Sequence, residues 1–172
     1  MHQKEFLSLI DPLKPGLFGF AYRLLRTRED AQDALQELMM KLWTNRSKLE
    51  TTGNIKTYVF TALYNDCIDR LRKRNRFRLI TGTDIPDVID TLRIDKDFEN
   101  RDLIRQIREA MDSLPPKQKI ILELRDFQEF DYEEIATMLK MTVNAVRVNV
   151  ARSRASISEM MIKEISYGTG TL

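Results

Sequence analysis

The side chains best suited to chemistry in this sequence are amides and guanidinium groups in a short stretch near the C-terminus. They are Asn144, Arg147, Asn149 and Arg152, with Arg154 just beyond. Asparagine and arginine hydrogen-bond base edges in the DNA major groove, and arginine also binds phosphate. The stretch therefore predicts a DNA-reading face, with an ordinary solvated basic helix face as the alternative.

The elements that would position these side chains are two helices separated by a very short turn. Apolar residues recur at helical spacing in both: Tyr132, Ile135, Ala136 and Leu139, then Val143, Val146, Val150 and Ile157. Asp131 and Glu134 have the pattern of a capping box, and Thr142 suits the N-cap of the second helix. The three-residue connection, residues 140–142, predicts a helix-turn-helix, although other helical bundles contain the same arrangement.

A basic segment in the middle of the chain is a second candidate for nucleic-acid binding. A helix is predicted over residues 55–76, and six Lys or Arg residues lie between positions 70 and 78. Tyr58, Phe60 and Tyr64 precede them on the same helix. Cations that follow phosphates and rings that stack on bases suit single-stranded or partly opened DNA. The alternative is that the charges compensate the helix dipole and the rings belong to the core.

An acidic helix near the N-terminus is a candidate docking surface. Residues 27–30 (TRED) have the form of a capping box that starts this helix. The residues expected to face inward are Ala31, Leu35, Leu38 and Leu42. Other faces carry Asp33, Gln36, Glu37 and Met40, with Trp43 at the end of the helix. A methionine and a tryptophan beside carboxylates suit a protein partner. The alternative is that the charges are solvated and Trp43 is part of the core.

Composition predicts a globular, all-α chain. The 172 residues are 42% hydrophobic and carry a formal charge of +2, so any nucleic-acid surface must come from clustered charge. Cys67 and His2 stand alone, which leaves no disulfide framework or zinc site and favours a cytoplasmic setting. We expect no metal, no cofactor and no enzymatic activity, because no nucleophile or acid–base pair is apparent. No apolar run approaches the length of a membrane span.

The helical pattern divides the chain into two small domains. We predict a first domain over residues 1–79, a flexible acidic linker over residues 80–99, and a second domain over residues 100–172. We expect the apolar residues of the linker to rest on a neighbouring surface. The linker's acids either cover the basic surfaces when no DNA is present or only keep the linker soluble. Within the first domain, residues 45–53 are expected to form a polar loop. The last helix is expected to end near residue 165, followed by a frayed tail.

Three strings in this order resemble the bacterial RNA polymerase sigma factors of the extracytoplasmic-function group. Residues 30–43 (DAQDALQELMMKLW) resemble the polymerase-docking helix of that family, and residues 58–74 (YVFTALYNDCIDRLRKR) its promoter-melting and minus-10-reading helix. Residues 113–124 (SLPPKQKIILEL) and 131–154 (DYEEIATMLKMTVNAVRVNVARSR) are similar to its minus-35-reading half. The likeness covers nearly the whole chain.

The resemblance implies three groups of site residues. Core polymerase docking would use Asp30, Asp33, Gln36, Glu37, Met40 and Trp43. Minus-10 DNA would be bound by Tyr58, Asn65, Arg72, Lys73, Arg74 and Arg76. Minus-35 DNA would be bound by Thr142, Asn144, Arg147, Val148, Asn149, Arg152 and Arg154. The implied partners are core RNA polymerase, promoter DNA and an anti-sigma factor that is often membrane-bound, with no small-molecule substrate.

The chain departs from the family pattern at four positions. Lys140 stands where the turn usually has glycine, so the turn must accept a side chain there. Val148 and Asn149 replace a small polar and a basic residue, which leaves the base preference open. Tyr58 replaces a common tryptophan and keeps a ring.

Two other functions remain as alternatives. One is a stand-alone helix-turn-helix regulator that binds operator duplex, and the other is a purely protein-binding helical adaptor.

Overall fold

A computed structural model describes residues 2–81 and 101–168, and every element within them is helical. The chain divides into two compact units, Met1–Leu92 and Arg93–Leu172. The all-α prediction with a C-terminal helix-turn-helix is confirmed. In the described part of the chain, no helix is long and apolar enough to cross a membrane.

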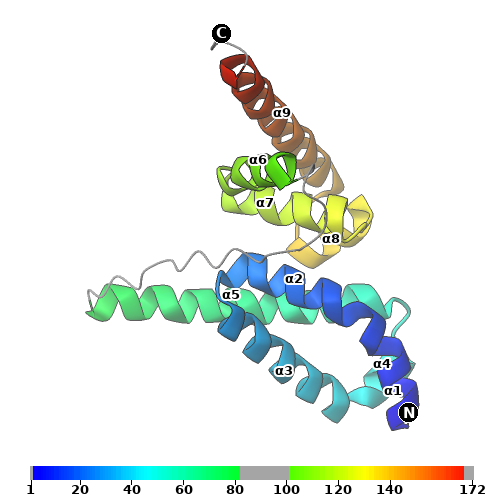
Figure 1. Cartoon of the computed structure of the whole chain (residues 1–172). Coiled ribbons are helices and arrows are strands. Elements are labelled where there is room, and N and C mark those ends of the chain that lie inside the picture. Colours follow the sequence, from blue (N-terminus) through cyan, green and yellow to red (C-terminus); the bar gives the residue numbers. More distant parts are fainter. Residues whose placement is uncertain (1, 82–100, 169–172) are drawn as a thin grey trace. The chain divides into compact units, whose positions relative to one another are not determined.

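The N-terminal unit is built on three mutually packed helices. Its elements are α1 (Gln3–Ile10), the 3-10 turn η1 (Asp11–Leu13), α2 (Lys14–Leu25), α3 (Arg28–Thr44), α4 (Arg46–Glu50) and α5 (Ile55–Thr81). In Figure 1, α2 lies along α5, and α3 runs at an angle to both while packing against them. The rings of Phe20 and Phe60 meet in this core with centroids 5.7 Å apart, and both are almost fully buried. The packing fixes how the exposed faces of α3 and α5 are presented.

The turn from α2 to α3 shows why α3 begins where it does. Arg26 ends α2 in the left-handed conformation (φ 69°), and its N–H donates to the Tyr22 carbonyl at 2.8 Å. Thr27 then accepts a hydrogen bond from the Asp30 N–H at 3.2 Å. The capping box predicted here is only half formed, because the Asp30 carboxylate lies 3.8 Å from Arg74 on α5. Aspartate is one methylene shorter than the glutamate that completes such a box.

The polar loop expected over residues 45–53 is wrong in part, because residues 46–50 form the short helix α4. Leu49 is only 2% exposed and anchors this helix to the core. The hydroxyls of Thr51 and Thr52 donate to the Lys48 carbonyl at 3.1 and 2.7 Å, which satisfies the end of the helix. One apolar anchor in five residues gives no periodicity, so this turn of helix is not visible in the sequence pattern.

The C-terminal unit packs three shorter helices against the first part of a long one. Its elements are α6 (Arg101–Asp112), α7 (Pro116–Leu122), the π-helical turn η3 (Glu123–Phe127), α8 (Tyr132–Leu139) and α9 (Val143–Gly168). Met111, Leu114 and Leu122 form a core cluster with Ile107 and Ile157 packed against it. The C-terminal part of α9 projects beyond the other helices (Figure 1).

The helix-turn-helix forms as the sequence predicts. Asp131 and Glu134 make a complete capping box, with bonds of 2.7 and 3.0 Å. Thr142 accepts from the Ala145 N–H at 3.2 Å and caps α9. Lys140 takes the left-handed conformation (φ 53°) at the position where the family that the sequence resembles usually has glycine. A lysine side chain therefore occupies a backbone conformation that favours glycine.

Two helix ends differ from the predictions. The last helix continues to Gly168, beyond the predicted end near residue 165. Likewise α5 continues to Thr81, beyond the predicted end at residue 76, so Ile80 and Thr81 of the predicted linker belong to the helix. The rest of the predicted linker, residues 82–99, and the end of the predicted tail, residues 169–172, lie outside the described residues.

Candidate nucleic-acid interface and docking surface

The two sides of the first half of α9 differ sharply in exposure. Val146 and Val150 face the core and are 0% and 2% exposed. Asn144, Arg147, Val148 and Arg152 are all exposed. Arg147 lies three residues after Asn144, and Val148 lies four residues from both Asn144 and Arg152, so these four residues line one side of the helix. This side is the recognition face, defined here as Asn144, Arg147, Val148 and Arg152.

Arg147 is held only loosely in the free protein. Its guanidinium carbon lies 5.5 Å from the centre of the Tyr132 ring, and its Nη2 lies 3.9 Å from the Glu133 carboxylate. Both partners of this ion pair are more than half exposed, so the pair contributes no more than about 1 kcal/mol to stability. Contacts this weak can be exchanged for a base edge or a phosphate.

Arg125 is an additional cation beside this face that sequence reasoning missed. It lies on η3, and its guanidinium carbon is 4.7 Å from the centre of the same Tyr132 ring. Its Nη1 also donates to the Phe130 carbonyl at 2.7 Å, which holds the side chain near the start of α8. The signal that could have found it is the tyrosine at the first position of α8, an aromatic ring that attracts guanidinium groups.

Asn149 and Arg154 are predicted to bind DNA, but in the structure their side chains bond other groups of the C-terminal unit. The Asn149 side-chain amide donates to the Ala145 carbonyl at 2.7 Å and is half-buried. Arg154 donates twice to the Asp126 carboxylate on η3, and this hydrogen-bonded pair raises the pKa of Arg154. Both side chains therefore spend their donors within the C-terminal unit. Thr142, also predicted, is exposed and serves as the cap of α9.

One face of α5 gathers most of the predicted minus-10 residues. Tyr58, Asn65, Arg72 and Arg76 are spaced at near-multiples of the helical repeat and are all exposed, with Tyr58 at 37%. Lys73 is exposed beside them. The other two rings are less accessible. Phe60 is core, and Tyr64 is half-buried, which raises the pKa of its hydroxyl. The α5 reading face is defined here as Tyr58, Asn65, Arg72, Lys73 and Arg76.

Arg74 does not belong to this face. Its Nη1 donates to the Leu25 carbonyl at 3.4 Å and lies 3.8 Å from the Asp30 carboxylate, so it joins α5 to the start of α3. Arg72 pairs with Asp69 on its own helix at 3.5 Å, with both side chains mostly exposed. The side chain of Arg78 lies outside the described residues. The basic cluster thus splits into a structural part and an exposed part.

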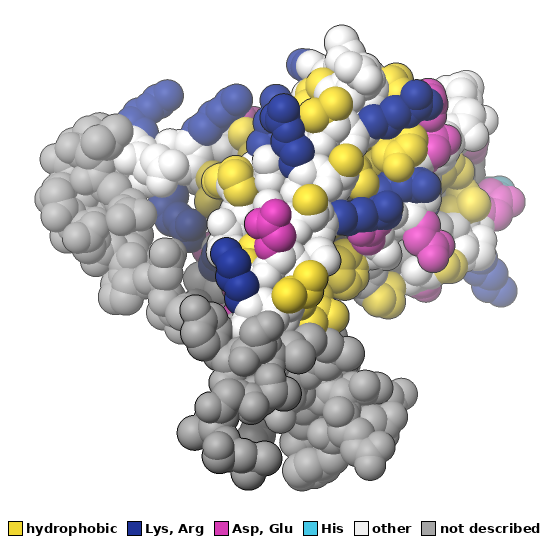
Figure 2. All heavy atoms as spheres, turned by 90° about the horizontal axis from the view of Figure 1, so that it is seen from above, with side chains coloured by type: hydrophobic (Ala, Val, Ile, Leu, Met, Phe, Trp, Pro, Cys, Tyr) yellow, Lys and Arg dark blue, Asp and Glu magenta, His cyan; other side chains and the backbone are white. Residues whose placement is uncertain are grey.

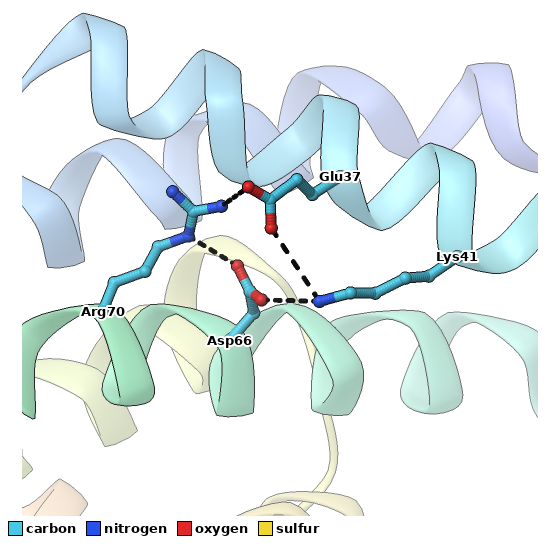
Figure 3. A network of polar contacts seen from close by, with 4 residues as sticks. All are labelled: Glu37, Lys41, Asp66 and Arg70. Carbon is cyan, nitrogen blue, oxygen red and sulfur yellow. Dashed lines mark hydrogen bonds and ion pairs between the residues drawn. The ribbon is translucent and has the colours of Figure 1, made fainter. Parts of the chain in front are cut away.

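A four-residue ion-pair network joins α3 to α5 (Figure 3). Arg70 bonds Glu37 and Asp66, each at 2.7 Å, and Lys41 bonds Asp66 at 2.8 Å and lies 4.0 Å from Glu37. Partial burial opposes ionisation of Asp66, but the hydrogen bonds from Lys41 and Arg70 outweigh it and lower the pKa of its carboxyl. Glu37, a predicted docking residue, is therefore also a structural one.

The exposed face of α3 carries the remaining docking candidates. Asp33 and Gln36 are exposed, and Met40 is 70% exposed. Trp43 is 38% exposed, so its side chain is neither fully in the core nor fully on the surface. Its ring meets Phe6 of α1 edge-on with centroids 5.2 Å apart, and Arg46 lies 4.6 Å over it. The α3 docking face is defined here as Asp33, Gln36, Glu37, Met40 and Trp43.

Figure 2 shows a face on which Lys and Arg side chains stand apart among hydrophobic and acidic ones. No cluster among the described residues could hold a metal ion. Cys67 is buried in the N-terminal unit, and burial raises the pKa of its thiol to about 12.

Comparison with known proteins accounts for both units. Residues 9–77 match sigma-70 region 2, and residues 104–157 match sigma-70, region 4. The RNA polymerase sigma factor SigV of Bacillus subtilis is 26% identical over 158 residues, which cover 92% of this chain and 92% of SigV. The ECF RNA polymerase sigma factor SigW of the same organism is 23% identical over 168 residues, covering 92% and 90%. The chain belongs to the ECF group of RNA polymerase sigma factors.

A solved structure shows the same fold. The sigma factor RpoE of Bartonella quintana, in complex with the anti-sigma factor NepR, superposes with a TM-score of 0.78 at 24% identity, over 92% of this chain and 97% of that one. CnrH in complex with the cytosolic domain of CnrY superposes with a TM-score of 0.66 at 17% identity, over 94% and 90%.

The family fixes the general function of this sigma factor. Sigma factors are non-enzymatic transcription initiation factors, and their regions 2 and 4 recognise the minus-10 and minus-35 promoter elements. The region 2 match contains the exposed faces of α3 and α5, and the region 4 match contains the helix-turn-helix.

Proposed function

We propose that this sigma factor binds core RNA polymerase through the α3 docking face and divides promoter reading between α5 and α9. The observation that carries the proposal is the clean separation of these faces. Each has a row of exposed polar or apolar side chains opposite a buried row on the same helix. Exposed side chains at fixed spacing on a packed helix make a preorganised binding surface.

The docking contact combines one apolar and several acidic or amide groups. Met40 supplies adaptable apolar contact, and Trp43 supplies a large ring whose position Phe6 supports. Asp33 and Gln36 would meet basic or polar groups of a polymerase helix. Glu37 would have to share its carboxylate between that partner and Arg70, so it orients the surface as well as contacting it.

Minus-10 recognition is assigned to the α5 reading face. Arg72, Lys73 and Arg76 would follow the phosphates, while Tyr58 would stack on a base that has left the duplex and Asn65 would hydrogen-bond a base edge. Each stacked base contributes about 1 to 3 kcal/mol, which offsets the cost of unstacking the promoter. Opening then follows from a higher affinity for the single strand than for the duplex.

Minus-35 recognition is assigned to the recognition face of α9. Arg147 and Asn144, near the start of the helix, would enter the major groove, and Arg152 would reach phosphate. Arg154 and Asn149 have a smaller part, because their donors already bond Asp126 and the Ala145 carbonyl. Arg125 would add a phosphate contact beside them.

An anti-sigma factor is the third proposed partner. The two superposed sigma factors are bound to NepR and to the cytosolic domain of CnrY. By analogy, a protein that covers the α3 docking face or the two reading faces would keep this sigma factor inactive. Because its partners would be core polymerase and the promoter, its action would be cytoplasmic, and the anti-sigma factor could itself be anchored in a membrane.

Reconstituted transcription tests the proposal directly. Core polymerase would be incubated with genomic fragments, with and without this chain, and the start sites mapped. We expect initiation at discrete sites only when the chain is present, and none with the chain carrying a charge reversal at Asp33. Specific DNA binding with two-fold footprints in the absence of polymerase would instead indicate a stand-alone helix-turn-helix regulator.

A further inference from the structure

The recognition face contains an apolar side chain that the core does not require. Val148 is 37% exposed and stands between Asn144, one turn before it, and Arg152, one turn after it. The core side of α9 is already occupied by Val146 and Val150. A β-branched residue on a solvated helix face costs helix propensity and leaves apolar surface in water. Its position therefore fits a partner that supplies an apolar group.

The neighbours of Val148 narrow what that group can be. Asn149, the next residue, turns its amide to the Ala145 carbonyl and is half-buried. Ala151, at the following turn on the Val148 side, is exposed and also apolar. The surface around Val148 thus offers methyl groups where the flanking Asn144 and Arg147 offer hydrogen bonds.

Major-groove chemistry has one apolar feature that matches. Among the four bases only thymine presents a methyl group there, at C5, whereas cytosine presents an N4 amino donor and the purines present N7 acceptors. An amino group facing Val148 would lose its water without gaining an acceptor, which disfavours cytosine at that place. Val148 therefore distinguishes bases by a methyl contact rather than by a hydrogen bond.

We infer that Val148 makes this sigma factor select thymine at one position of the minus-35 element, next to the base pair read by Arg147. The inference rests on the proposed minus-35 role of α9 and adds the identity of a base to it. The thymine methyl packs between the two Val148 methyls and Ala151. Arg147, held near the Tyr132 ring and Glu133 before binding, reads the adjacent pair by hydrogen bonds.

The experiment removes the methyl groups either from the thymine base or from Val148. Holoenzyme made from the full chain and core polymerase selects from a promoter library with a randomised minus-35 element, at one fixed salt concentration. The library is amplified with thymidine triphosphate or, in a second version, with deoxyuridine triphosphate. Uracil differs from thymine only by lacking the C5 methyl group. With thymidine we expect one position enriched in thymine. With deoxyuridine the enrichment at that position should disappear while the others remain.

A cycle with a protein variant assigns the effect to Val148. For the selected promoter, replacing that thymine by deoxyuridine should weaken holoenzyme binding about fourfold, the value for burying one methyl group. With Val148→Ala the same replacement should change binding less than twofold. Val148→Thr, which keeps one methyl group, should retain most of the discrimination. All three chains should bind core polymerase equally without DNA.

Three outcomes are decisive. A methyl effect that depends on Val148 supports the inference. No methyl-dependent position, or one that Val148→Ala leaves unchanged, overturns it, while promoter-specific initiation by the same holoenzyme leaves the proposed function standing. Failure of the unmodified chain to direct initiation on any library member would reject the proposed function itself.

Discussion

Two arginines of α5, Arg70 and Arg74, and two of α9, Arg147 and Arg152, are used in opposite ways. On α5, Arg70 and Arg74 are bonded to acids or carbonyls of α2 and α3, and they hold the N-terminal unit together. On α9, Arg152 forms no ion pair with any described residue, and Arg147 has only a weak one. The same residue type on a long helix thus serves packing at two positions of α5 and remains available for a partner at two positions of α9.

The difference shows that charge alone does not identify a binding residue. A guanidinium group that bridges two carboxylates at 2.7 Å, as Arg70 does, would have to break both bonds to reach DNA. One that lies over a ring beside an exposed carboxylate, as Arg147 does, gives up little. The partner of a charge in the free protein therefore indicates its role better than its position in a basic run.

The largest expected effect is at Arg147. Arg147→Ala should lower initiation at the cognate promoter roughly tenfold to a hundredfold, because a major-groove arginine contributes about 1 to 3 kcal/mol. Binding to core polymerase, measured without DNA, should not change. Glu133→Ala removes the ion-pair partner and keeps the arginine, so it should be near neutral. If Arg147→Ala weakened polymerase binding as much as it lowered initiation, α9 would not be assigned to the DNA interface. The contrast between the two units would then fail.

The next effect concerns stability in the N-terminal unit. Arg70→Met should lower its free energy of unfolding by about 1 to 2 kcal/mol, because Glu37 and the mostly buried Asp66 lose a charge-assisted partner. Arg72→Met, on the same helix with a largely exposed side chain, is the matched control and should change stability by less than about 0.5 kcal/mol. Urea unfolding would measure both. Equal effects would show that Arg70 is not the structural member of the pair.

A smaller effect is expected at the docking surface. Met40→Ala should weaken the affinity for core polymerase about fivefold and leave stability unchanged, since the side chain is 70% exposed. Val148→Ala, which removes an exposed apolar residue from the recognition face, is the control and should leave affinity for polymerase without DNA intact. Unchanged affinity in Met40→Ala would limit docking to the acidic residues of α3.

The smallest effect is at the turn of the helix-turn-helix. Lys140→Gly should raise the free energy of unfolding of the C-terminal unit by about 0.5 to 1 kcal/mol, because glycine adopts the φ of 53° without strain. Lys140→Ala keeps the strain and should not stabilise the unit. The minus-35 preference should be the same in both variants. A stabilisation by alanine equal to that by glycine would assign the gain to loss of the charge instead of relief of the backbone.

What could be predicted from sequence follows rules that act over a few residues. The caps at Asp131 and Thr142 and the three-residue turn are local patterns, and all are present in the structure. The short helix α4 escaped prediction because Leu49 is its one apolar anchor. The π-helical turn η3, which carries Arg125, has no distinctive local signal.

The site was less predictable than the fold, because its side chains depend on contacts between distant segments. Glu37 and Arg70 meet only through the packing of α3 against α5, so the sequence did not indicate the structural role of either residue. The inward turn of Asn149 is a choice of side-chain rotamer, which helical periodicity does not specify.

Cys67 gives the N-terminal unit a built-in reporter. It is the single thiol of the chain, it is 0% exposed, and burial raises its pKa to about 12, which makes the thiolate rarer still at neutral pH. Thiol reagents need both access and the thiolate, so the folded unit should resist them. The rate of alkylation in the unmodified chain would therefore count its opening events, and slowing by a bound partner would measure that partner's affinity without any engineered label.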